Sequence, residues 1–435
     1  MLSASLSRRL ERRGIHYAWV IVAVTFMTGL ASSAALGLPG ALLQPLAKEF
    51  GWSVDAVSSA LAVRFALFGL MGPFAAILME RFGLRNVVVT ALGLIATGSL
   101  LATRMTAFWH LVALWGVMLG VASGMTALVL SAVVSNRWFE TRRGLVVGVL
   151  TASAATGQLA FLPVGAWLVQ QYGWRMAVWP VFVACAVVAV AAYLLMRDRP
   201  ADVGQAPYGL SQDAGAAQAA VPAAPVRLTW GTPFAVLREA AAHRTFWLLA
   251  GTFFICGLST NGLIQTHFIS LCGDAGLAAV PAASVLAMMG IFDLVGTILS
   301  GWLSDRYDNR KLLFWYYSLR GLSLLWLPYS EFTLYGLSLF AMFYGLDWIA
   351  TVPPTVRLTA ATFGREKAGM VFGWIFASHQ LGAAVAAFGA GKVRTLLFTY
   401  NPALFAAGAA CLVAALLALA VRRREAAVTV QRKAA

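Results

Sequence analysis

The chain has 435 residues, of which 60% are hydrophobic and only 11% are charged. Soluble domains are typically about 45–50% apolar and about 25% charged, so the composition excludes an ordinary soluble enzyme. The 32 Lys and Arg residues outnumber the 17 Asp and Glu residues, and the formal net charge of +15 could by itself indicate nucleic-acid binding. The arginines, however, lie in short clusters between long apolar runs, and the mean hydropathy is +0.78. This pattern excludes a nucleic-acid-binding module and indicates a protein that crosses a membrane several times.

Apolar runs recur along the whole chain, and each is long enough to form a membrane-spanning helix. A bilayer core about 30 Å thick needs roughly 20 residues of helix. We expect twelve spans, in chain order at 17–46, 54–79, 86–104, 107–134, 144–170, 175–196, 245–271, 282–303, 311–328, 332–356, 367–391 and 402–421. The sequence therefore predicts an all-α membrane protein with 12 transmembrane helices.

Positive charges set the predicted orientation, because cytoplasmic loops carry an excess of Lys and Arg. With the N-terminus inside, 25 of the 32 Lys and Arg residues fall in cytoplasmic segments, five fall outside, and Arg64 and Arg320 lie within spans. We therefore expect both termini to be cytoplasmic. The Ala-rich spans and the preference for Arg over Lys are typical of a GC-rich bacterial genome, so the expected location is a bacterial inner membrane.

The two halves of the chain resemble each other at a nearly constant offset. The matched pairs, 225 or 228 residues apart, are Gly120 and Gly345, Gly144 and Gly369, Gly148 and Gly373, Trp19 and Trp247, and Gly29 and Gly257. Residues 197–243 are rich in Ala, Pro, Gly and Gln and predict a flexible cytoplasmic linker. We therefore expect two pseudo-symmetric six-helix bundles, at 1–196 and 244–421, joined by a linker at 197–243 and followed by a cytoplasmic tail at 422–435.

No feature of the sequence predicts catalysis, a cofactor or a metal. The four cysteines lie in or beside apolar runs and lack the spacing of metal ligands. A phosphate-binding G-x-x-x-x-G-K-[ST] loop is missing, which argues against transport driven by ATP. We therefore expect a protein that is not an enzyme, has no metal site or cofactor, and works as a monomer in the lipid bilayer.

Two short loops carry the same charged motif at the repeat offset. The segments 76–85 (AILMERFGLR) and 301–311 (GWLSDRYDNRK) both resemble the G-x-x-x-D-R-x-G-R-R loop of the major facilitator superfamily. This resemblance covers nearly the whole chain and implies the major facilitator fold with a cytoplasmic gate held by charge pairs. The gate residues that it implies are Glu80, Arg81, Arg85, Asp305, Arg306 and Arg310. A turn pinned by charge is the structural alternative for the same residues.

A narrower resemblance is to the monocarboxylate transporters and their bacterial oxalate/formate-antiporter relatives. Residues 138–152 (WFETRRGLVVGVLTA) look like the fifth-helix signature of that group. Asp293 matches an aspartate in its eighth helix, whereas Thr297 stands where the group has the arginine that usually meets the carboxylate. The resemblance implies transport of small monocarboxylates.

Four charged residues lie well inside predicted spans rather than at their ends, and an ionised side chain costs about 2.5–3.5 kcal/mol at the helix centre. Each therefore needs a partner, a wet cavity or a function. We expect Arg64 to bind a substrate carboxylate, with an ion pair to Asp293 as the alternative. Asp293 and Asp347 are candidates for proton coupling or gating, and either acid could instead pair with Arg320.

Uncharged polar residues within the spans are further candidates. His379 and Gln380 lie near mid-depth of the eleventh span, and Asn261 and Gln265 share one face of the seventh span at i and i+4. We expect these four to shape the substrate site; hydrogen bonds between helices are the alternative. The prolines at 39, 353 and 354 are expected to break or kink the first and tenth spans.

Together these features predict a secondary active transporter that works by alternating access. The expected cargo is a small organic anion, a monocarboxylate, which moves together with protons. Export of amphipathic drugs or metabolites by proton antiport is the alternative within the same fold. A sensor derived from a transporter is a third hypothesis, but the linker offers it little structured output surface.

Overall fold

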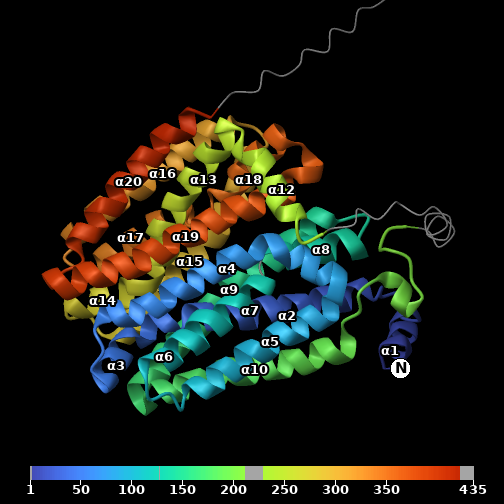
Figure 1. Cartoon of the computed structure of the whole chain (residues 1–435), viewed down its shortest axis with the longest axis horizontal. Helices are drawn as coiled ribbons and strands as arrows, with labels where there is room; N and C mark the ends of the chain where they lie inside the picture. Colours follow the sequence, from blue (N-terminus) through green and yellow to red (C-terminus); the bar gives the residue numbers. More distant parts are fainter. Residues whose placement is uncertain (1, 127, 211–228, 422–435) are drawn as a thin grey trace, which may run out of the picture.

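The structure is a computed structural model that describes residues 2–126, 128–210 and 229–421 (Figure 1). The expected cytoplasmic tail at 422–435 and the middle of the expected linker lie outside these residues. Every regular element of the described part of the chain is a helix, apart from one isolated bridge between Phe139 and Tyr208. The prediction of an all-α protein is thus confirmed for these residues.

The N-terminal half consists of long helical segments that run back and forth along the molecule. In chain order its elements are α1 (Leu2–Glu11), α2 (Ala18–Gly37), α3 (Pro39–Phe50), α4 (Val54–Phe82), α5 (Leu84–Ala102), α6 (Phe108–Leu111), the π-helix η1 (Val112–Met118), α7 (Leu119–Met125), α8 (Leu128–Trp138), α9 (Arg143–Tyr172) and α10 (Trp174–Leu195).

The C-terminal half follows the two described ends of the linker, which contain η2 (Pro200–Val203) and α12 (Thr232–Ala241). Its own elements are α13 (Arg244–Gly257), the π-helix η3 (Leu258–Gln265), α14 (Thr266–Asp274), α15 (Ala279–Ser304), α16 (Asn309–Trp326), η4 (Leu327–Tyr329), α17 (Leu334–Asp347), α18 (Val352–Phe363), α19 (Arg365–Leu397) and α20 (Asn401–Leu419).

Ten helices of the described chain are long and apolar enough to cross a membrane. Helices α9 and α16 occupy the two remaining positions at which we expect spans, but neither is among these ten. The total of 12 crossings and the cytoplasmic position of both termini therefore stay predictions.

Prolines break the first and tenth helical segments, as expected. Pro39 begins α3 directly after α2, and Pro353 and Pro354 lie in the first turn of α18, after a non-helical turn at 348–351. Proline has no N–H, so the carbonyl four residues earlier loses its helical donor. The carbonyls of Ala35, Ile349 and Ala350 are the ones affected, and the Val352 N–H donates to that of Ile349 at 2.8 Å. Other groups can therefore bind to the Ala35 and Ala350 carbonyls at the two breaks.

Close glycine contacts repeat in the two halves. A Cβ on Gly120 would lie 2.8 Å from the Arg64 carbonyl oxygen, and a Cβ on Gly345 would lie 2.5 Å from that of Met289. Arg64 and Met289 are themselves 225 residues apart, as the two glycines are. The same helix pairs therefore approach each other at equivalent points, which supports the internal repeat that the sequence indicates.

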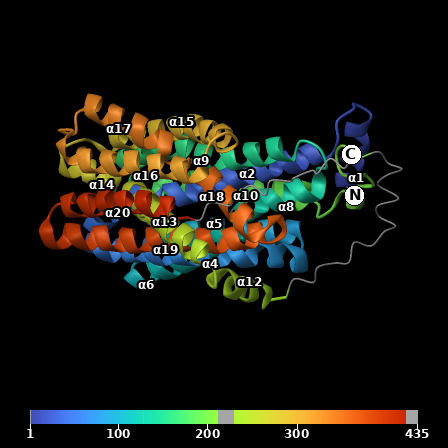
Figure 2. The ribbon, with the colours of Figure 1, turned by 90° about the horizontal axis from the view of Figure 1, so that it is seen from above.

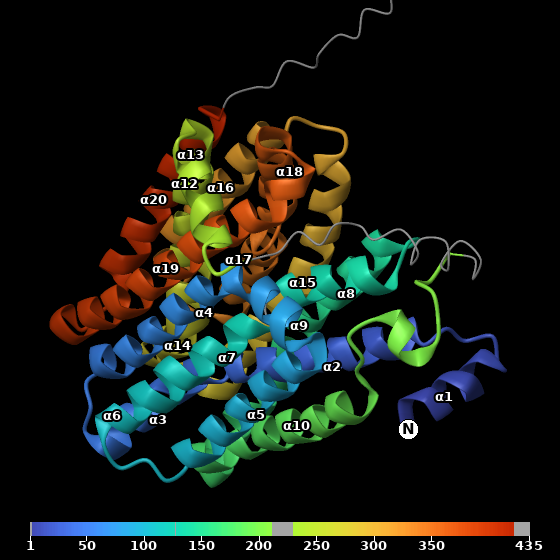
Figure 3. The ribbon, with the colours of Figure 1, turned by 45° about the vertical axis from the view of Figure 1, so that its right-hand side comes forward.

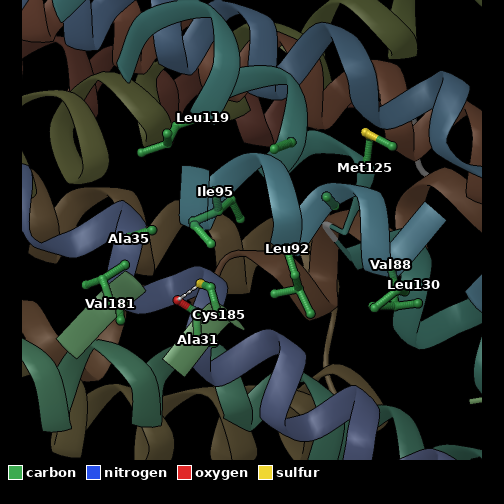
Figure 4. Packing of buried hydrophobic residues seen from close by; sticks show 14 of the residues in the cluster. Ala31, Ala35, Val88, Leu92, Ile95, Leu119, Met125, Leu130, Val181 and Cys185 are labelled. Atoms are coloured by element: carbon green, nitrogen blue, oxygen red, sulfur yellow. Dashed lines mark hydrogen bonds between the residues drawn. The ribbon is translucent and has the colours of Figure 1, made fainter. Parts of the chain in front are cut away.

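Each half has an apolar core of its own. In the N-terminal half, small and branched side chains of α2, α5, α7, α8 and α10 interdigitate, including Ala31, Leu92 and Cys185 (Figure 4). The Cys185 Sγ lies 3.8 Å from the Ala31 carbonyl oxygen. Two further clusters lie around Phe268 and Phe253 in the C-terminal half. The first of them also includes Ala41, Leu162 and Ala166 of the N-terminal half, so it extends across the contact between the halves near α3 and α9.

The two halves meet through α4 against α19 and α9 against α15. We call the end where α4, α8, α15 and α18 finish the basic end, and the end where α3, α5, α14 and α19 finish the opposite end. Figure 2 shows α1 beyond the helices at the basic end, with α6, α14 and α17 toward the opposite end. The opposite end is closed, because α3 packs against α14 and the Thr395 hydroxyl donates to Asp55 at 3.0 Å. Toward the basic end the two halves diverge, so that α8 of one half lies apart from α18 of the other (Figure 3).

The first part of the expected linker packs against the N-terminal half at the basic end. Residues 197–210, which we call the strap, follow α10 and pack against this half. Tyr208 pairs with Phe139 through backbone bonds to Trp138 and Glu140, and its ring makes an edge contact with His16 at 5.5 Å. The strap is therefore a folded part of the N-terminal half, whereas a flexible linker was expected for these residues.

Candidate functional site

A cavity of about 210 Å³ lies between the two halves, toward the basic end. Its lining comes from α2, α4, α7, α8 and α9 on one side and from α13, η3, α18, α19 and the turn at 348–351 on the other. We call it the central cavity. The lining residues are Thr25, Gly29, Ser32, Ser33, Leu36, Phe68, Ser123, Thr126, Leu130, Ser131, Leu150, Thr151, Ser153, Phe253, Cys256, Thr260, Asn261, Trp348, Ile349, Val352, Phe376, His379 and Gln380. None of these described residues carries a permanent charge.

Three of the predicted site residues line the central cavity: Asn261, His379 and Gln380. His379 and Gln380 are 8% and 1% exposed, and neither His379 Nδ1 nor Gln380 Oε1 has a hydrogen-bond partner among the described residues. A buried polar atom without a partner costs about 1–3 kcal/mol. Each of these lining residues therefore has an unmet hydrogen-bonding group among the described residues.

Gln265 does not line the cavity, although Asn261 does. The segment between them is the π-helix η3 rather than an α-helix. A π-helix turns more slowly than an α-helix, so residues at i and i+4 still lie on nearly the same face. Gln265 instead lies one turn nearer the opposite end than Asn261, where its carbonyl oxygen would be 2.6 Å from a Cβ on Gly40 of α3. Gln265 is buried, and its Oε1 has no partner in the described part of the chain.

Arg64 is 2% exposed and lies directly behind the cavity wall. Its Nη1 donates to the Ala35 carbonyl at 3.3 Å and its Nη2 to the Leu36 carbonyl at 3.2 Å. Ala35 is the residue whose carbonyl loses its donor to Pro39, and Leu36 lines the cavity. Nε has no partner, and no described carboxylate forms an ion pair with this guanidinium. The expected alternative, an ion pair with Asp293, is therefore not formed in this conformation.

Arg320 and Asp347 form a buried ion pair in the C-terminal half. Arg320 Nε lies 2.9 Å from Asp347 Oδ2, and the two side chains are 0% and 4% exposed. Arg320 Nη2 also donates to the Asp347 and Trp348 carbonyls at 2.5 Å and 3.1 Å, and Nη1 lies 2.8 Å from Cys256 Sγ. Of the two partners considered for Arg320, the structure selects Asp347. Its guanidinium also holds the start of the turn at 348–351.

Asp293 is 3% exposed and holds the same turn from α15. Its Oδ1 accepts hydrogen bonds from the backbone N–H of Ile349 at 2.8 Å and from the Thr297 hydroxyl at 3.1 Å. Asp293 and Asp347 both interact electrostatically with Arg320. Two carboxylates thus share one guanidinium, so the cluster has a surplus negative charge when both acids are ionised. Thr297, at the position of the arginine that the resemblance implies, is a direct partner of Asp293.

The predicted gate residues lie at the basic end, and their ion pairs stay within one half. Glu80 pairs with Arg137 at 2.5 Å and with Arg199 at 3.4 Å, whereas Asp305 pairs with Arg357. The other gate arginines have local contacts: Arg81 lies over the Trp230 ring, the Arg85 N–H donates to Asp198, Arg306 lies over the Trp302 ring, and Arg310 pairs with Asp308. In this conformation the described gate residues therefore do not join the two halves.

Two kinds of lining residue are missing from the sequence prediction. The first is the set of hydroxyls on the N-terminal wall, such as Ser32, Ser123 and Thr126. Burying a serine or threonine costs little free energy because its hydroxyl can bond a carbonyl of its own helix. These residues therefore do not stand out in an apolar run. The second is the aromatic set that includes Phe68 and Phe376. In the sequence of a membrane span, a phenylalanine that lines a cavity cannot be distinguished from one that faces lipid.

The described residues contain no group of three or more His, Cys, Asp or Glu that could hold a metal ion. The four cysteines are all free and buried. The site can therefore bind a ligand through neutral donors, acceptors and rings in a cavity between the two halves. Among the described residues, Asp293, Arg320 and Asp347 are buried behind the C-terminal wall of this cavity, and Arg64 is buried behind the N-terminal wall. A membrane transporter is the class of protein that this fold and site define.

The family assignment agrees with that class. The model of the Major Facilitator Superfamily matches residues 21–387, and the chain belongs to this superfamily. It is therefore a multi-pass integral membrane transporter and not an enzyme. The resemblance that the two charged loops indicate is thus confirmed.

Several curated proteins are similar to this chain at low identity. Monocarboxylate transporter 13 from Rattus norvegicus is 26% identical over 396 residues, which cover 90% of this chain and 86% of that protein. The uncharacterized MFS-type transporter YcxA from Bacillus subtilis (strain 168) is 22% identical over 383 residues, with coverage of 86% and 87%. The crystal structure of a D-xylose–proton symporter superposes with a TM-score of 0.71 at 13% identity, and the match covers 92% of this chain and 97% of that one. This last likeness shows the fold.

Proposed function

We propose that this transporter moves a small organic anion, of the monocarboxylate class, together with protons. The basic end faces the cytoplasm of a bacterium, the chain crosses the inner membrane 12 times, and it acts as a monomer. In this arrangement the structure corresponds to an inward-facing state, with the opposite end closed and the central cavity reached from the cytoplasmic side. The gate residues of the two charged loops then form new pairs when the basic end closes.

The observation that carries the proposal is the imbalance of buried charge in the described residues. Arg64 is a buried cation whose described contacts are two neutral carbonyls and the Phe65 ring, and Asp293 is a buried acid whose one nearby described cation is already paired with Asp347. Burying an unpaired charge is expensive, so each group favours a mobile counter-charge. A substrate carboxylate supplies one for Arg64, and a proton neutralises Asp293.

The cycle follows from these two needs. A carboxylate in the cavity near Leu36 draws the Arg64 guanidinium from the carbonyls of the α2–α3 break, and Asn261, His379 and Gln380 line the same cavity around the rest of the cargo. A proton on Asp293 removes the surplus negative charge beside the turn at 348–351. Both events neutralise buried charge between the halves, which favours the rocking motion that carries the loaded site across the membrane. Asp347 stays paired with Arg320 in this scheme.

The named relatives support the substrate class, because monocarboxylate transporters match this chain over most of its length. The size of the cavity supports a small cargo. Pockets that bury drug-sized ligands have volumes of about 300–1,000 Å³, and the central cavity has about 210 Å³. Export of amphipathic drugs, the other candidate, is favoured only by the aromatic residues in the lining.

The test is proton entry into proteoliposomes that contain a trapped pH dye, measured while single organic acids are added. Wild type, Arg64→Gln and protein-free liposomes are compared, because undissociated acids also cross lipid unaided. We expect at least one acid to acidify only the wild-type vesicles. If every acid gives the protein-free rate, and drug-loaded vesicles lose their cargo on acidification, the exporter replaces our proposal.

A further inference from the structure

The central cavity has one aromatic wall that continues across both halves. Phe68 from α4 meets Phe376 from α19 edge to face at 5.5 Å, and the Phe376 ring is stacked on that of His379 at 5.8 Å and 9°. Phe253 from α13 lies 4.9 Å from the His379 ring. We call these four residues the aromatic wall. Aromatic rings prefer offset-stacked or edge-to-face neighbours at 4.5–7 Å, and this wall leaves ring surface on its cavity side for a further such neighbour.

The facing side of the cavity carries hydroxyl groups. Thr25, Ser123 and Thr126 come from α2 and from the end of α7, and they are 2%, 2% and 8% exposed. Thr25 Oγ1 and Ser123 Oγ have no hydrogen-bond partner among the described residues. We call Thr25 and Ser123 the free hydroxyls. Thr25 and Ser123 both line the cavity, and each hydroxyl could donate to and accept from a polar atom of a ligand.

We propose that the substrate is a carboxylic acid that carries one aromatic ring and a hydroxyl or keto group. The inference rests on the proposed function and narrows its substrate class. The ring packs against the aromatic wall, the hydroxyl or keto oxygen bonds to the free hydroxyls, and the carboxylate faces the α2–α3 break that Arg64 holds. A cavity of about 210 Å³ suits a single ring rather than a fused ring system.

Matched ligands test the proposal without changing the protein. Binding to the detergent-purified full chain is measured by thermal stabilisation and calorimetry for benzoate against cyclohexanecarboxylate, and for 3-phenyllactate against 3-phenylpropionate. The members of the first pair differ in aromaticity, and those of the second differ in one hydroxyl. We expect the aromatic and the hydroxylated member to bind about fivefold or more tightly, because a ring contact and a hydrogen bond each contribute on this scale. Equal affinities within both pairs would overturn the inference.

Two variants locate the binding. Phe376→Leu should reduce the preference for benzoate over cyclohexanecarboxylate about fivefold, whereas Phe388→Leu, an exposed position on the same helix, should keep it. Ser123→Ala should remove the preference for 3-phenyllactate, and the exposed Ser284→Ala should keep it. If the Phe376 variant does not fold, the comparison of ligands on the wild-type chain still decides.

The outcomes separate this inference from the proposed function. If short aliphatic acids drive proton entry and aromatic acids neither bind nor compete, the proposed function stands and the aromatic substrate class is wrong. If no acid binds or moves protons, both fail together. If aromatic acids bind, compete with the transported acid and show the preference for a hydroxyl group, the proposed function and the aromatic substrate class are both supported.

Discussion

Asp293 Oδ1 lies 2.8 Å from the backbone nitrogen of Ile349, so a carboxylate on α15 holds the turn that separates α17 from α18. The same turn is held at its start by Arg320 and at Ala350 by the Ser300 hydroxyl, which donates to the freed carbonyl at 2.6 Å. Trp348 and Ile349 line the central cavity. A change of charge on Asp293 therefore acts directly on Ile349, a residue that lines the central cavity.

Arg64 should be required for substrate binding and not for folding. Arg64→Gln keeps donors for the Ala35 and Leu36 carbonyls but loses the charge, so we expect transport to fall at least tenfold while the melting temperature stays within a few degrees. Arg64→Lys keeps the charge and should retain partial activity with a raised KM. Uptake kinetics and thermal unfolding of the purified variants measure both effects. Normal uptake by the Gln variant would remove Arg64 from the site.

The Arg320–Asp347 pair should act mainly on stability. Removing one partner of a buried ion pair leaves an uncompensated charge and costs about 3–5 kcal/mol. Arg320→Gln and Asp347→Asn should therefore unfold at clearly lower temperature than the wild type. The double variant Arg320→Met/Asp347→Leu should recover most of the loss, because both charges are gone. Single variants as stable as the wild type would show that the pair is not the anchor of this region.

The strap should release from the N-terminal half as the pH falls. His16 Nδ1 accepts from the Ala18 N–H at 3.1 Å, and Nε2 lies 3.0 Å from the Ala206 carbonyl oxygen, so the ring is held in its neutral form. Burial lowers the pKa of His16 below its ordinary value of 6.5, against the opposing effect of the bond to Ala206. The packed state thus binds fewer protons than the released state, and its stability is full above pH 6.5 and is lost as the pH falls below it.

Limited proteolysis measures this release. We expect cleavage within the strap (197–210) to be faster at pH 5.5 than at pH 7.5 in the wild type, and His16→Gln to remove most of the difference. Tyr208→Ala should give fast cleavage at both values, because the ring contacts to His16, Trp19 and Phe139 are lost. Cleavage at one rate across this pH range in the wild type would count against the role of His16.

Single cysteines should reveal which side the cavity opens to. In a chain whose four buried cysteines are replaced by alanine, Thr151→Cys places a thiol in the lining of the central cavity and Lys392→Cys places one at the opposite end. An impermeant maleimide should label the first only in inverted membrane vesicles and the second only in right-side-out ones. The reverse pattern would mean that the basic end faces outward.

The sequence predicts the architecture well because long apolar runs and glycine spacing are direct consequences of the bilayer and of helix packing. The repeat-related contacts of Gly120 and Gly345 and the breaks at Pro39 and Pro353 could all be expected from residue type alone. The buried charges could also be located, since Arg64, Asp293, Arg320 and Asp347 are costly wherever they lie in a span. All four are buried in the structure.

The arrangement within the site could not be predicted in the same way. Asn261 lines the central cavity and Gln265, one turn further along, does not, because the depth at which the cavity ends is set by how the helices pack. The partner of Arg320 depends on the crossing of α16 and α17, which the sequence does not specify. Ser123 and Phe376 are ordinary residues of apolar helices and become part of a cavity only because of how the helices pack.

The most direct test of the central claim is a comparison of net proton entry with substrate exchange in wild type and Asp293→Asn proteoliposomes. Asparagine has the shape of the protonated acid but cannot release a proton. We expect the wild type to show acid-driven proton entry and exchange of labelled for unlabelled substrate. The Asn variant should keep exchange, within a few-fold, and lose proton entry. Proton entry at the wild-type rate in this variant would contradict the account, because the proton would then travel with the substrate without Asp293.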